Sequence, residues 1–89
     1  MLEKIKKALR ISHDQLDDEI TDLIEACKLD MKISGVNVIN ETDPLIIRAV
    51  ITYSKANFGL VNEDSEKYTE SFKSQVIHLA TCGDYNVVQ

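Results

Sequence analysis

The sequence is poor in the residues that build disulfide-linked, aromatic-rich or membrane-spanning proteins. Its 89 residues include no tryptophan, two cysteines, one proline and three glycines. Two cysteines make no disulfide framework, and no C-x-x-C pair is present to begin a zinc site. No run approaches the roughly 18 apolar residues of a membrane span, and the N-terminus lacks the apolar core of a secretory signal. We therefore expect a cytosolic chain with reduced, buried cysteines and no contact with a membrane.

Charge and length restrict the possible functions further. Ten lysines and arginines against 15 aspartates and glutamates give a net charge of −5. This balance argues against a dedicated binder of the nucleic-acid backbone, which needs an excess of basic side chains. The hydrophobic fraction of 44% is enough for a folded core. We expect one domain over residues 1–89, with a modest core of the kind that oligomerisation often stabilises.

The few glycines and the proline stand between segments of helical periodicity. Gly35, Gly59 and Gly83 each follow such a segment, where a left-handed closing residue would sit. Asp43 followed by Pro44 is typical of an N-cap and a first helical residue. The pattern predicts helices from Met1 to about Arg10, from about Leu16 to Ile33, from Pro44 to Phe58, and from an Asn62 cap to about Cys82.

Two of these segments carry the prediction of the fold. Ser12 and Gln15 match a capping box before the second helix, with Asp14 as a rival cap, and acidic residues follow in its first turn. The third segment is apolar on nearly every side, which is typical of a helix covered by neighbours or by another subunit. The sequence therefore predicts an all-α protein, a small bundle of about four helices with a central apolar helix.

No arrangement of side chains predicts a reaction. His78 and Cys82 lie one helical turn apart, but zinc needs three or four ligands, and His13 and Cys27 are in other segments. The acidic residues near Asp14 lack the glycine of a calcium loop. Neither a phosphate-binding loop nor a nucleophile elbow is present. We expect no catalytic, cofactor-binding or metal-binding residues, and no enzyme activity.

Helical domains of this size often bind DNA, so a DNA-binding or regulatory module is the alternative. The fourth segment carries polar side chains that read bases, including Lys67, Lys73 and Gln75. The same segment also carries four acidic residues, which would repel phosphates: Glu63, Asp64, Glu66 and Glu70.

The order of several short motifs points to a family. YSKANFG occupies residues 53–59, and the next helix contains Tyr68-x3-Phe72 and ends before Gly83-Asp84-Tyr85. The opening Leu2-x2-Ile-x2-Ala-Leu pattern, the acidic DQLDDEI step and the DPL start of the apolar helix complete the set. Over about residues 2–86 the chain resembles the small phage head–tail connector, or adaptor, proteins of phages and prophages of Gram-positive bacteria.

The resemblance implies a structural protein of the virion, present in the host cytoplasm during assembly. Such adaptors form a ring under the portal protein and join it to the next connector or tail-completion protein. DNA passes through the channel without specific binding, and the family implies no cofactor and no catalytic residue. The resemblance leaves open whether the isolated chain is a monomer or a ring.

The C-terminal tail is the segment that we predict to bind a partner. An apolar pair, Val87 and Val88, lies at an end without helix signals and could become ordered on contact with the portal. The alternative is a frayed terminus. The predicted partner-binding residues are Tyr85, Asn86, Val87, Val88 and Gln89.

Overall fold

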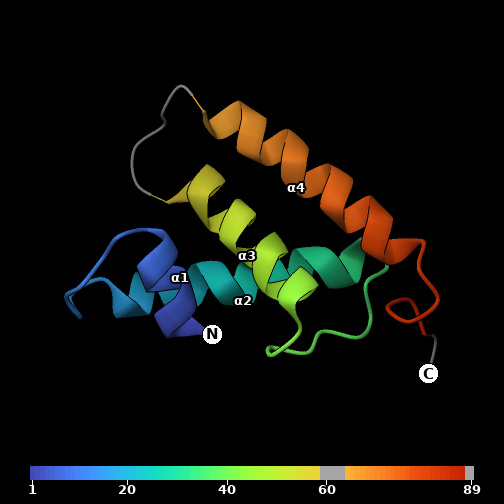
Figure 1. Cartoon of the computed structure of the whole chain (residues 1–89), viewed down its shortest axis with the longest axis horizontal. Helices are drawn as coiled ribbons and strands as arrows, with labels where there is room; N and C mark the ends of the chain where they lie inside the picture. Colours follow the sequence, from blue (N-terminus) through green and yellow to red (C-terminus); the bar gives the residue numbers. More distant parts are fainter. Residues whose placement is uncertain (59–63, 88–89) are drawn as a thin grey trace.

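Four α-helices make up the fold in the computed structural model, which describes residues 1–58 and 64–87 (Figure 1). They are α1 (Leu2–Ala8), α2 (Asp17–Ile33), α3 (Pro44–Asn57) and α4 (Ser65–Ala80). No strand occurs in the described residues, so the predicted all-α bundle is confirmed. None of these helices is both long and apolar enough to cross a bilayer. Gly59 and Asn62, for which we predicted a helix end and a helix cap, lie outside the described residues.

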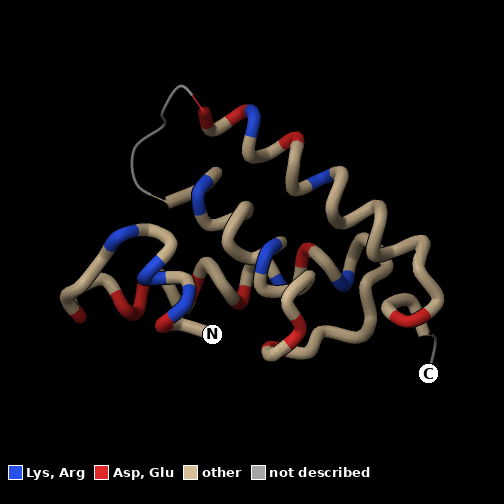
Figure 2. Tube along the Cα trace, in the orientation of Figure 1, with Lys and Arg blue, Asp and Glu red and all other residues tan. Residues whose placement is uncertain are grey.

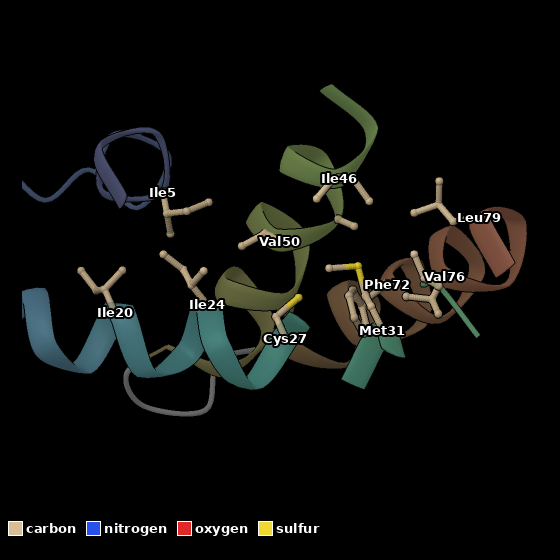
Figure 3. Packing of buried hydrophobic residues seen from close by; sticks show 12 residues of the cluster. Ile5, Ile20, Ile24, Cys27, Met31, Ile46, Val50, Phe72, Val76 and Leu79 are labelled. Carbon is tan, nitrogen blue, oxygen red and sulfur yellow. The ribbon is translucent and has the colours of Figure 1, made fainter. Parts of the chain in front are cut away.

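Helix α3 is the central element, because it packs against each of the other three helices. Figure 3 shows α1 and α3 on the same side of α2, with core side chains of the three helices directed toward one another. Helix α4 packs along the far side of α3, where the Tyr53 and Phe72 rings meet edge to face with centroids 5.0 Å apart. The hydrophobic core comprises Ile5, Ile20, Ile24, Cys27, Met31, Val36, Ile46, Ala49, Val50, Phe72, Val76 and Leu79.

The predicted start of α3 is confirmed in atomic detail. Asp43 is the N-cap, and its Oδ1 accepts a hydrogen bond of 2.9 Å from the Leu45 N–H. Pro44 occupies the first helical position, where its missing N–H leaves no helical hydrogen bond unmade. An Asp-Pro pair is therefore sufficient to fix this helix boundary.

The predicted second helix is confirmed to within one residue, but its predicted side-chain cap is wrong. Helix α2 begins at Asp17 with Leu16 as its N-cap, and no side chain caps it. Asp14 instead contacts Lys6 of α1, whose Nζ lies 2.9 Å from Asp14 Oδ1 and 2.8 Å from Asp17 Oδ1. The carboxylate of Asp14, the alternative cap in the sequence, is therefore paired with a buried lysine. Ser12 does not cap the helix, because α2 starts five residues after it.

A left-handed glycine closes α2, as predicted, but none closes α4. Gly35 has φ 104°, and the Gly35 and Val36 N–H groups bond to Lys32 O and Met31 O in a Schellman motif, as predicted. Gly83 is not left-handed, because α4 already ends at Ala80. The Asn86 side-chain amide donates to the Ala80 carbonyl at 2.9 Å and so satisfies the last turn without a glycine.

Helix α1 ends in a second Schellman motif, which the sequence pattern did not reveal. Arg10 takes the left-handed position with φ 61°. Its N–H bonds to Lys7 O at 3.1 Å, and the Ile11 N–H bonds to Lys6 O at 2.9 Å. A residue with a Cβ is strained in this conformation, so the tight turn after α1 costs free energy.

Relief of that strain is the first testable prediction. We expect Arg10→Gly to raise the free energy of unfolding by about 0.5–1 kcal/mol, since the left-handed penalty exceeds the entropy that glycine adds to the unfolded chain. The arginine is exposed and forms no ion pair with any described residue, so little contact energy is lost. Urea unfolding measures the change. Arg10→Ala keeps the strain and should give no gain; an equal gain would show that φ is not the cause.

Candidate functional surfaces

The C-terminal turn folds back on the connection between α2 and α3. The Asn37 and Val38 N–H groups both donate to the Tyr85 carbonyl, at 2.7 and 3.1 Å. The Tyr85 hydroxyl donates to Asp43 Oδ2 at 2.7 Å, which ties the turn to the N-terminus of α3. Of the predicted partner-binding residues, Tyr85 and Asn86 are thus bonded within the chain, and Val87 is 46% exposed. Val88 and Gln89 lie outside the described residues.

Asp43 organises this corner with both of its carboxylate oxygens. Oδ1 caps α3 and Oδ2 accepts from Tyr85, so the carboxylate must be ionised to serve both. The hydrogen bond from Tyr85, and then that from the Leu45 N–H, lower the pKa of Asp43 below its ordinary value. The same hydrogen bond, with some burial, raises the pKa of Tyr85 to about 12. Both shifts stabilise the pairing of a neutral phenol with a charged carboxylate.

We expect Tyr85→Phe to destabilise the chain at neutral pH, because Asp43 Oδ2 loses its donor. The raised pKa of Tyr85 stabilises the fold fully below pH 10, and this contribution disappears as the pH rises toward 12. The difference in melting temperature between wild type and variant should therefore shrink across that window in thermal scans. Tyr68→Phe removes a phenol that no described residue hydrogen bonds, and it serves as the control. A constant difference up to pH 12 would contradict the assignment.

An open groove lies between the C-terminal ends of α2 and α3 and the part of α4 from Thr69 to its C-terminus. It has a volume of about 690 Å³. Its ionisable side chains are Asp30, Tyr53 and Lys73, and no two of them form a hydrogen bond or an ion pair. A general base must lie within hydrogen-bond reach of the group that it activates. The rest of its lining is mostly apolar and neutral: Ser34, Ala56, Asn57, Thr69, Phe72, Val76, Ile77, Ala80 and Thr81.

The candidate metal ligands do not converge. Within residues 1–58 and 64–87 no three side chains of His, Cys, Asp or Glu are placed to hold a metal ion. Cys27 is fully buried, as predicted, and burial raises the pKa of its thiol to about 12, which makes it a poor nucleophile. Cys82 is only half-buried, so the expectation that both cysteines lie inside is wrong for one of them. Cys82 lies two residues after the end of α4 at Ala80.

Charges of the two signs are unevenly distributed over the first three helices. Figure 2 shows Lys and Arg on α1, on the turn after it and on α3, and Asp and Glu along the first half of α2. Helix α3 contains no acidic residue, and α1 contains one, Glu3. The side of α2 that faces away from the core carries a row of exposed residues, namely Asp18, Asp22, Glu25, Leu29 and Ile33.

The sequence analysis missed this row, which we call the outer stripe of α2. We interpreted the first acidic residues of α2 as partners of the helix dipole and rejected them as a calcium loop, and we did not consider Glu25. The sequence did contain an indication of this surface. Leu29 and Ile33 are apolar but do not belong to the buried stripe of Ile20, Ile24 and Cys27. In the structure Leu29 is 60% and Ile33 is 85% exposed. Large apolar side chains that stay exposed next to one another indicate a surface for another protein.

The fold and its surfaces thus define a small all-helical protein with features of an assembly component. The chain matches the phage connector protein family over residues 1–86, and it belongs to that family. No curated protein and no solved structure matches it. The predicted resemblance is therefore confirmed, and with it a structural role in the phage particle, in contact with other head or tail proteins.

Proposed function

We propose that this protein is a head–tail connector that forms a ring under the portal protein, around the channel through which DNA leaves the head. The observation that carries the proposal is the family match, which spans residues 1–86 of a single small chain. The match thus covers all four helices and the start of the C-terminal turn. The proposed partners are further copies of the chain, the portal protein, and the next connector or tail-completion protein.

The charge and packing of the chain support this role. A closed ring needs two different faces on each subunit, one matching the other. The acidic and apolar outer stripe of α2 and the basic side of α1 and α3 are two such faces. The net charge of −5 also suits a channel wall that DNA passes without sticking. We propose no cofactor and no reaction for the chain, and we place it in the host cytoplasm during assembly and in the virion afterwards.

The C-terminal segment of residues 85–89 is the proposed contact with the portal. Tyr85 and Asn86 anchor its start to the fold, so the contact would be made by the residues that follow the anchor. Val87 is the exposed apolar side chain at that point. An apolar side chain held on an anchored turn loses less conformational entropy on binding than one on a free end.

Electron microscopy of the full chain mixed with the portal ring of its phage tests the proposal. We expect added density on the portal ring with the symmetry of a second ring. Val87→Asp should weaken binding about tenfold or more, as for an apolar anchor residue, while Ile77→Asp on exposed α4 should not. The proposal fails if no complex forms and the chain instead binds DNA in a salt-dependent manner, which is the signature of the alternative function.

A further inference from the structure

We propose that the outer stripe of α2 binds a second copy of this chain, docking against the basic side formed by α1 and α3. This inference rests on the proposed function, because it assigns the contact between neighbouring subunits of the ring. Asp18, Asp22 and Glu25 of one subunit would face Lys4 and Lys7 of the next, whereas Arg48 of α3 lines a hollow with Glu66 and Glu70 of α4 and lies at the border of this side. Leu29 and Ile33 would continue the contact beyond the charged part.

The two faces lie on opposite sides of the unit in which α1 and α3 pack on α2. Inside the subunit, Ile20 and Ile24 of α2 are directed toward Ile5 of α1 (Figure 3). Successive residues of a helix are 100° apart, so Asp22 lies on the side of α2 away from Ile20 and Ile24. By the same geometry Lys7, two residues after Ile5, lies on the outer side of α1. Stacking one subunit on the next therefore brings an α2 outer side against an α1 and α3 outer side.

Most charges on these faces have no partner within the described chain; the exception is Glu25, whose Oε1 lies 3.5 Å from Lys28 Nζ. Lys4, Lys7 and Arg48 are exposed and form no ion pair with any described residue, and the same holds for Asp18 and Asp22. Lys6 of the same helix differs from Lys4 and Lys7, because it is buried and forms two ion pairs. The basic groups that remain outside are thus available to another molecule, and complementary charge decides which molecule fits.

The spacing along α2 fits packing against helices. The outer stripe advances by four, three, four and four residues from Asp18 to Ile33, which keeps one side of the helix in register with a partner. Its acidic half alone would attract any cation. Its apolar half, with Ile33 at 85% exposure, requires a surface that removes it from water. A protein face with basic side chains meets both requirements, and this chain carries one.

The test measures self-association of the full chain by sedimentation velocity at low salt. We expect oligomers larger than dimers, which dissociate at about 0.5 M NaCl, where the Debye length is roughly 4 Å. Asp22→Lys and Lys7→Glu should each weaken association about tenfold or more. An equimolar mixture of the two variants should associate again, because each supplies the charge that the other lacks. Ile33→Ser should also weaken association without changing the net charge.

Two control variants change the net charge by the same amounts as these reversals, but at positions outside the proposed interface. Asp84→Lys lies in the turn after α4, and Lys67→Glu lies on exposed α4, and both should associate like the wild type. Circular dichroism of every variant verifies that the fold is kept. The proposal is overturned if the wild type stays monomeric at low salt, if the reversals have no effect, or if the mixture does not recover.

The outcomes also separate this interface from the proposed function. If rings form on the portal whatever the charges of Asp22 and Lys7, the connector function stands and this interface is wrong. If association depends on these charges but the portal never binds, the interface is supported and the proposed function fails.

Discussion

Val50→Asp is expected to abolish the cooperative fold. Val50 is completely buried in the middle of α3, and Figure 3 shows it directed toward Ile5 of α1 and Ile24 of α2. A carboxylate there would lose its hydration without gaining a partner, at a cost of several kcal/mol. A domain of this size has roughly 5 kcal/mol of stability in total. Circular dichroism should show loss of the helical signal or a melting temperature near ambient.

The matched control is Leu45→Asp on the same helix. Leu45 is 43% exposed in the first turn of α3, where a negative charge interacts favourably with the helix dipole. Its substitution should cost less than about 1 kcal/mol. If Val50→Asp melted at the same temperature as Leu45→Asp, α3 would not be the buried centre of the fold, and the packing described for it would be wrong.

Lys6→Met is the second substitution with a large expected effect. The side chain of Lys6 is 5% exposed, and its Nζ bridges Asp14 and Asp17 at 2.9 and 2.8 Å. Methionine fills similar space but removes the cation that holds the Asp14 and Asp17 carboxylates against α1, and Asp17, at 31% exposure, regains only part of its hydration. We expect the melting temperature to fall by several degrees and the loop between α1 and α2 to become sensitive to proteolysis. Lys7→Met removes an equal charge from the exposed side of α1 and should change little.

The stability contributed by the Lys6 ion pairs should also depend on pH. The hydrogen bond from Lys6 lowers the pKa of Asp14 below its ordinary value of 3.8. That interaction stabilises the fold above pH 3.8 and is lost as the pH falls through the lowered pKa. Thermal scans should therefore show the wild type and Lys6→Met converging in acid, below about pH 4. Parallel curves down to pH 2 would mean that the Lys6 ion pair contributes nothing to stability.

Local sequence rules predicted those parts of the fold that depend on neighbouring residues. The Asp43–Pro44 start and the Gly35 end of α2 are confirmed, because capping and left-handed closure involve groups within a few residues. The same rules failed at Ser12 and Gly83. At the start of α2 no side chain caps the helix, because Lys6 pairs with the carboxylate of Asp14. At the end of α4 the Asn86 side-chain amide donates to the Ala80 carbonyl, so Gly83 is not needed to close the helix.

The candidate surfaces were only partly predictable. The composition of the tail identified it as a candidate surface. The composition did not reveal that hydrogen bonds hold Tyr85 and Asn86 in place, because Tyr85 and its partner Asp43 are 42 residues apart. The outer stripe of α2 was visible as apolar residues on the wrong side of an amphipathic helix. Without the structure, however, nothing showed whether α4 or another helix covers Leu29 and Ile33.

The sequence by itself determined that the chain is helical, where α3 begins, which sides of the helices are apolar, and to which family the chain belongs. These features follow from periodicity, capping and motif order, which act over short stretches of chain. Only the tertiary structure decided that Lys6 is buried with two carboxylates, that Tyr85 locks the C-terminal turn, and that α2 keeps an uncovered side. Burial and ion pairing depend on which distant segments pack together, and the free energy of that packing is a property of the whole chain.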